Sequence, residues 1–139
     1  VTAMRHIPEG LFVDEQSVTI AEFAGGLSTY RTRWGTFTDP WTTQPQPFCG
    51  FVVVGTNGTI VSKDFASTLS VQTHERPDVH EIAVDEPTEA TQNALSYLLH
   101  CRANGIPPEG PCTLETALQG QLIVDAARKS MAEGKVVDL

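Results

Sequence analysis

The chain has 139 residues and a mass of 15.1 kDa, and apolar residues make up 40% of it. That is enough apolar material for one hydrophobic core, so we expect a single domain over residues 1–139. Nine basic and seventeen acidic side chains give a net charge of −8, which repels polyphosphate backbones and anionic membranes. We therefore expect neither nucleic acid nor a membrane as a partner.

The longest apolar run, residues 51–54, is far shorter than the roughly 20 residues that cross a bilayer. The N-terminal residues carry no secretory leader, and Val1 is not an initiator methionine, so we expect a fragment of a longer polypeptide. Three cysteines, Cys49, Cys101 and Cys112, are too few for a disulfide scaffold and fit small buried side chains. These features favour a cytoplasmic protein.

Short runs of β-branched and aromatic residues, separated by Gly, Pro, Asn and Asp, fill the first two thirds of the chain. They predict a sheet over about residues 11–84. Tight turns at Gly25-Gly26 and at residues 56–58 require the strands that they join to run antiparallel. The expected strands cover residues 17–24, 27–37, 48–54, 59–63, 68–73 and 79–84.

Alternation along the 27–37 strand places Arg31 and Arg33 on one face of the sheet and Tyr30 and Trp34 on the other. Such a strand fits a sheet that meets a substrate, a second domain or a partner subunit, and it fits a solvated face equally well. The Pro-rich residues 36–47 that follow predict an ordered, extended loop.

After residue 85 the apolar period becomes helical. Start signals at Pro87-Thr88 and a stop at Asn104-Gly105 predict a helix over about residues 88–104, and Thr113 caps a second one over about 113–133. Gly120, in the middle of this second helix, costs about 1 kcal/mol relative to alanine, which suggests close approach by another backbone.

The β-prone residues 136–139 predict a short last strand at the sheet edge. The fold class is α+β: an open, mainly antiparallel sheet followed by two C-terminal helices and this last strand.

No catalytic or metal-binding constellation stands out in the sequence. The glycines of residues 55–59 follow a strand, but they precede another strand rather than a helix, which indicates a hairpin turn instead of a phosphate cradle. The acidic pairs lie at element boundaries, where carboxylates usually act as solvated caps. No metal-ligand spacing joins the histidines, and we expect no metal ligand and no catalytic residue. The histidines are His6, His74, His80 and His100.

Several motifs occur in an informative order: the segment from Asp14 to Gly26, the run FVVVGTNGTI over residues 51–60, and a helix carrying ALSYLLHC over residues 94–101. Then follow Asn104-Gly105, AARKS at 126–130 and GKVV at 134–137. Over residues 14–139 this order resembles the C-terminal domain of the glucose-fructose oxidoreductase and inositol dehydrogenase family.

The resemblance implies a two-domain NAD(P)-dependent oxidoreductase that acts on a sugar or polyol. The family's GxGxxG fingerprint, its Glu-Lys-Pro lysine and its catalytic Asp…His or Asp…Tyr pair would all lie upstream of Val1. The full-length protein would then use NAD or NADP in a separate N-terminal dinucleotide-binding domain. This chain would bind no cofactor and would be inactive by itself.

The resemblance also suggests two kinds of site. The family loop that reaches toward the substrate corresponds to residues 41–48, where Gln44 and Gln46 suit hydrogen bonds to sugar hydroxyls and Trp41 suits stacking on a pyranose. A Pro-rich surface connection without contacts explains this loop equally well. Family members also associate through the open face of the sheet, which implies a homo-oligomer, with a dimer expected. The candidate interface residues are Tyr30, Trp34 and either Arg31 or Arg33, since the two pairs lie on opposite faces.

A rival hypothesis is a stand-alone, non-catalytic module that binds a small ligand or pairs through its sheet. A small enzyme that uses Asp or His in a concavity of the sheet is a third possibility, with no set of residues behind it.

Overall fold

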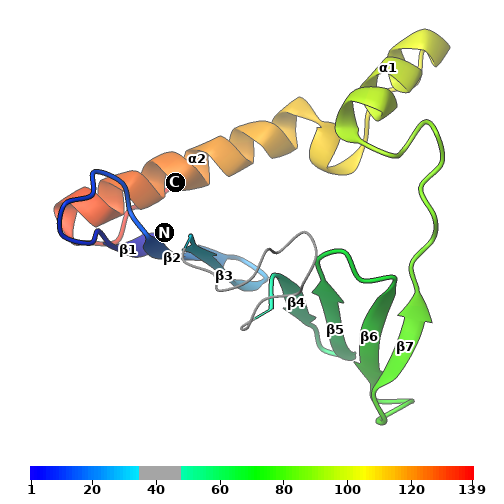
Figure 1. The fold of residues 1–139 in the computed structure, drawn as a ribbon, viewed down its shortest axis with the longest axis horizontal. Coiled ribbons are helices and arrows are strands. Elements are labelled where there is room, and N and C mark those ends of the chain that lie inside the picture. Colours follow the sequence, from blue (N-terminus) through cyan, green and yellow to red (C-terminus); the bar gives the residue numbers. More distant parts are fainter. Residues whose placement is uncertain (35–47) are drawn as a thin grey trace. The chain divides into compact units, whose positions relative to one another are not determined.

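The structure is a computed structural model that describes residues 1–34 and 48–139. These divide into two compact units: residues 1–34 with 87–139, and residues 48–86. Figure 1 shows the chain coloured along the sequence. The two antiparallel sheets and two C-terminal helices confirm the predicted α+β class with open sheets. The sequence predicted one sheet, but the structure has two, because no backbone pairing joins the third strand to the fourth in the described residues.

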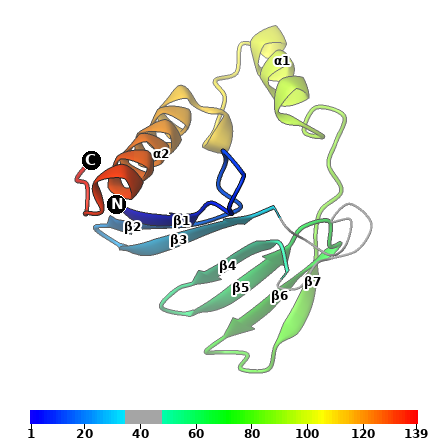
Figure 2. The same ribbon diagram turned by 60° about the vertical axis from the view of Figure 1, so that its left-hand side comes forward.

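The first unit contains a three-stranded antiparallel sheet in the order β1-β2-β3, followed by two α-helices and a short 3-10 helix, η1. Figure 2 shows the last and longest helix, α2, lying across one face of this sheet. The elements are β1 (Thr2–His6), β2 (Gln16–Phe23), β3 (Gly26–Arg33), α1 (Ala94–Asn104), η1 (Gly110–Cys112) and α2 (Leu114–Glu133).

β1 is absent from the sequence-based prediction. Thr2–His6 lacks a run of β-branched residues, and its strand conformation depends on pairing with β2, in the register Thr2↔Ile20 to His6↔Gln16. The predicted last strand is not formed, but Val137 exchanges two backbone hydrogen bonds with Val1, at 2.7 and 2.9 Å. This reciprocal pair places the C-terminal residues beside the edge of the first sheet, where the strand was expected.

The two helices end as the sequence predicts, but the first begins later. Gly105 and Gly134 terminate the helices in the left-handed conformation, and Thr113 caps α2 by accepting a hydrogen bond from the Thr116 amide. The predicted start of the first helix at residue 88 is wrong. Thr88 instead forms a separate turn with Thr91, and the helix begins at Ala94 behind the cap residue Asn93.

The core of the first unit lies between the sheet and α2, and it is built from small side chains. Ser130, which is 1% exposed, accepts a 3.0 Å hydrogen bond from the Ala3 amide through its Oγ. Small residues allow a helix to lie close to a sheet, so this contact fixes α2 over β1. The buried residues in this layer are Ala3, Thr19, Ala21, Ala126, Ala127 and Ser130.

The second unit is a four-stranded antiparallel meander in the order β4-β5-β6-β7. None of its described side chains is fully buried. The alternation of its strands places mainly apolar side chains on one face, which we call the apolar face. The other, which we call the polar face, carries the charged side chains together with Val52, Val54 and Val61. The strands are β4 (Gly50–Val54), β5 (Gly58–Lys63), β6 (Thr68–Thr73) and β7 (His80–Ala83).

On the polar face, the Ser70 hydroxyl donates a 2.6 Å hydrogen bond to the Glu81 carboxylate. This bond, with a second from Thr68, holds the pKa of Glu81 below its ordinary value. Because the pKa of Glu81 is lower in the folded state than in the unfolded state, its carboxylate stabilises the unit at pH values above the unfolded-state pKa. This contribution is lost as the pH falls through the folded-state pKa. We expect Ser70→Ala to raise the pKa of Glu81 in a carboxyl NMR titration. Ser62→Ala, on the apolar face, serves as the control and should leave it unchanged.

Candidate functional site

The candidate site is a groove of about 800 Å³ in the first unit, between the sheet and α2. We call it the α2 groove. Its volume is within the range of sites that bind small molecules. Its lining residues are Arg5, Val13, Asp14, Ser17, Thr19, Tyr30, Thr32, Trp34, Gly120, Ile123, Val124, Ala127, Arg128 and Met131.

The sheet side of the groove follows from strand alternation. The register Ser17↔Thr32 and Thr19↔Tyr30 brings these four side chains to the face that α2 covers. The Ser17 and Thr32 hydroxyls form a 2.6 Å hydrogen bond with each other. Trp34 follows β3 at one end of the groove, where it is 79% exposed although its amide donates to the Glu15 carbonyl at 3.0 Å. Among the residues that the structure describes, the groove is therefore open at its aromatic end.

The helix side of the groove is a stripe along α2. Gly120, Ile123, Val124, Ala127 and Met131 recur at helical spacing and so share one side of the helix. Two of these five residues, Gly120 and Ala127, are small and lie two turns apart.

Two guanidinium groups lie at the groove and carry its positive charge. Arg5 comes from β1 and Arg128 from α2, and the same two residues line a smaller polar hollow together with Asp125. Within the described residues neither arginine forms an ion pair or a hydrogen bond, while the Asp125 carboxylate accepts from Gln121 at 3.0 Å. In a chain with a net charge of −8, these arginines are available to an anionic group.

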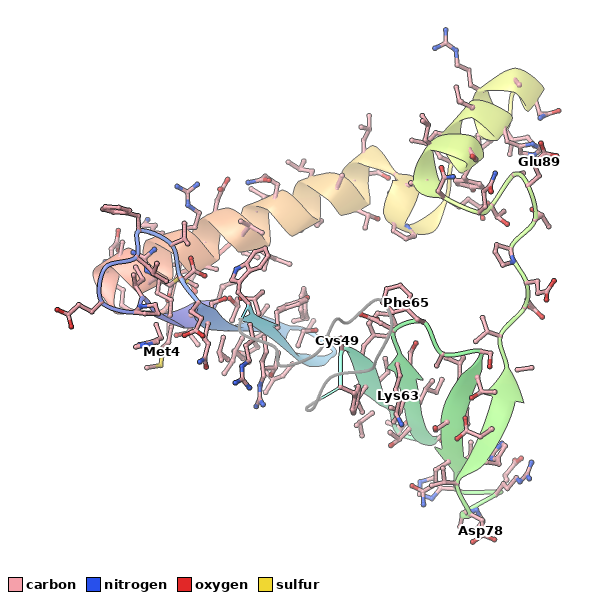
Figure 3. The ribbon with its side chains drawn as sticks, viewed as in Figure 1. Met4, Cys49, Lys63, Phe65, Asp78 and Glu89 are labelled. Carbon is pink, nitrogen blue, oxygen red and sulfur yellow. The ribbon has the colours of Figure 1, made fainter. Side chains whose placement is uncertain are left out.

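The structure separates the predicted interface residues, as the alternation requires. Tyr30 and Trp34 line the α2 groove, whereas Arg31 pairs with Val18 and Arg33 with Gln16 on the opposite face. Figure 3 shows Met4, which pairs with Val18, on that face of the sheet, away from α2. The predicted substrate residues Trp41, Gln44 and Gln46 lie outside the described residues.

The glycine-rich residues 55–59 form the predicted hairpin turn between β4 and β5. The Gly55 amide donates to the Gly58 carbonyl at 2.8 Å, and an antiparallel strand follows the turn. A dinucleotide pyrophosphate is held by free amides at the start of a helix, so this turn does not fit such a cofactor. In the described residues no group of three or more His, Cys, Asp or Glu side chains converges on a possible metal site.

Sequence reasoning missed most of the groove. Arg5 lies in the strand that was not predicted, and nothing in the sequence pairs it with Arg128. The close approach of another backbone that was predicted at Gly120 is wrong for the described residues, because a Cβ there would have no described atom within 4 Å.

Replacing Gly120 by alanine is expected to stabilise the isolated chain by about 1 kcal/mol. An added Cβ would have no described atom within 4 Å, so only the gain in helix propensity remains. Urea unfolding followed by circular dichroism measures the change. Gly134→Ala is the control: Gly134 has φ +66°, so alanine there should destabilise the chain. A destabilised Gly120→Ala chain would indicate that another segment already contacts Gly120.

Comparison with known proteins identifies no relative: no protein-family model, curated protein or solved structure matches the chain. Among the described residues, neither α-helix is sufficiently long and apolar to span a bilayer.

Proposed function

We propose that this chain is the C-terminal, substrate-binding and dimerisation domain of a cytoplasmic NAD(P)-dependent oxidoreductase that acts on a sugar or polyol. The order of motifs over residues 14–139 supports the proposal, as does the α+β architecture with two closing helices. Hydride transfer requires a bound cofactor and a group that takes the hydroxyl proton. Both would belong to the N-terminal dinucleotide-binding domain, so the chain alone would be inactive.

The observation that carries the dimerisation part is the apolar face of the second unit. The register places side chains from all four strands on this face, where Phe51 is 66% exposed and Val53 is 58% exposed. A contiguous exposed apolar surface of this kind marks an interaction site. Its apolar members are Phe51, Val53, Ile60, Leu69, Val71 and Ile82, accompanied by Ser62 and His80.

Two such faces would form an isologous dimer by packing sheet on sheet. A glutamate in the centre of that layer would be desolvated without a partner. We therefore expect Val53→Glu to weaken the dimer at least about a hundredfold in analytical ultracentrifugation. Val52→Glu is the matched control, because Val52 directly precedes Val53 in β4 and is 51% exposed on the opposite face of the sheet. Equal effects of the two variants would contradict this interface.

The oxidoreductase part is tested by reading the gene upstream of the Val1 codon and by a cofactor titration. The proposal expects an encoded strand, GxGxxG turn and helix upstream, and no enhancement of NADH or NADPH fluorescence by residues 1–139 alone. Tight binding of either cofactor to this chain would overturn it. A start codon next to Val1 would instead favour a stand-alone ligand-binding or oligomerisation module, for which the α2 groove is the candidate site.

A further inference from the structure

We propose that the α2 groove binds an acidic amphipathic helix from outside residues 1–139, with carboxylates facing Arg5 and Arg128. The inference does not depend on the oxidoreductase proposal, because it rests only on the geometry of the first unit. Three independent features of the described residues of the first unit carry it: the part of the sheet face that α2 leaves open, the exposed Gly120 on α2, and two arginines without partners among those residues.

The first feature is incomplete coverage of the sheet. α2 is fixed over β1 by the bond between Ala3 and Ser130, and it leaves the corresponding face of β3 lining an open groove. Tyr30 remains half exposed there and Trp34 more so. Sheets bury such a face against a second layer of secondary structure, and a helix beside α2 would complete that layer.

The second feature is the stripe on α2. Helices packed side by side have axes about 8–10 Å apart, and small residues at the contact allow the shorter distance. Gly120 provides such a position: it is exposed, and the space beside it is empty of described atoms, whereas Ala127, two turns further on, is already buried against the sheet. An extended segment fits less well, since a sheet face offers no backbone groups to pair with its amides and carbonyls. A helix satisfies its own backbone within itself.

The third feature is charge. Arg5 and Arg128 reach the groove from opposite layers and have no ion-pair partner among the described residues. One or two carboxylates on the polar edge of the docked helix would match them, while its apolar side covers Ile123, Val124 and Met131. Asp14, which also lines the groove, would disfavour a second acidic group near its own position.

Trp34 provides the readout. In a Trp41→Phe chain it is the single tryptophan, and its exposure predicts efficient quenching by acrylamide before any partner is added. The probes are two Trp-free synthetic peptides of about 20 residues, because isolated helices shorter than about 12–15 residues are only marginally stable in water. Both carry leucine and alanine on one side. They differ only in glutamate or glutamine at two positions on the polar edge.

The glutamate peptide is expected to shift the Trp34 emission to shorter wavelength and to protect it from acrylamide, with saturation. The glutamine peptide should bind about tenfold more weakly. The double variant Arg5→Gln, Arg128→Gln should bind the glutamate peptide as weakly as the unchanged chain binds the glutamine peptide. The double variant Arg31→Gln, Arg33→Gln, on the opposite face of the sheet, should bind the glutamate peptide with unchanged affinity. Gly120→Leu should abolish binding by filling the groove, in a chain whose helix content is preserved because leucine favours helix more than glycine does.

Three results would overturn the proposal. The first is that neither peptide alters Trp34 in the folded chain. The second is that both arginine pairs have the same effect, which would indicate a long-range effect of removing positive charge rather than contact with Arg5 and Arg128. The third is that a small aromatic acid such as 4-phenylbutyrate protects Trp34 as well as the glutamate peptide does, which would assign the groove to a small ligand.

Discussion

Alanine in place of Gly58 is expected to destabilise the second unit by about 3 kcal/mol, the upper end of the usual effect of overpacking. Gly58 begins β5 and pairs with Thr73 of β6. A Cβ there would collide with the Gln72 carbonyl oxygen and lie 2.9 Å from the Thr73 Cα. Both are backbone atoms, and they cannot move without breaking the hydrogen bonds between β5 and β6.

Hydrogen exchange of the β5 and β6 amides measures this loss directly, because exchange there reports opening of the second unit. Gly55→Ala is the matched control in the same turn: its nearest neighbour would be the Gly58 carbonyl oxygen at 3.7 Å, an ordinary contact. We expect a change of less than about 0.5 kcal/mol for it. Equal exchange in the two variants would show that the β5–β6 pairing tolerates a side chain at Gly58.

Replacing Ser130 by alanine is expected to cost the first unit about 2 kcal/mol, because it leaves a buried amide without an acceptor. The Ser130 Oγ accepts from the Ala3 amide at 3.0 Å in a buried setting, and it links α2 to the newly found strand β1. The loss should therefore appear as early exchange of the β1 amides together with a lower urea midpoint.

Ser17→Ala is the control for this second substitution. Its hydroxyl bonds Thr32 on the same face of the sheet, but the pair is exposed to water, which can replace the bond. A change below about 0.5 kcal/mol is expected. If the two serine variants lose equal stability, the hydrogen bond to Ala3 is not what holds α2 to the sheet.

Most of the elements could be predicted because their signals are local. The β6 strand was predicted with its observed bounds, and Gly105 ends α1 as expected. The start of α1 was predicted at the wrong residue. Thr88 and Asn93 are both good cap residues, and the local sequence does not show which of them begins the helix. β1 was missed for the same kind of reason: its strand conformation depends on a partner whose position the local sequence does not specify.

The candidate site was predicted only in part. Alternation correctly separated Tyr30 and Trp34 from Arg31 and Arg33, because successive side chains of a strand point to opposite faces. It did not indicate which face meets α2. That depends on Ala3, Ala21, Ala127 and Ser130, whose small size carries no signal until they are seen together.

The sequence by itself determined the α+β class, the hairpin turns, the C-terminal ends of both helices and the start of α2. The signals are glycine conformations, a threonine cap and alternation, all of which act within a few residues. Only the tertiary structure decided that the strands form two sheets, that β1 joins the first, and that Arg5 and Arg128 meet at one groove. These features depend on contacts between residues far apart in the chain, and the free energy of such contacts comes from burial and pairing that no local pattern records.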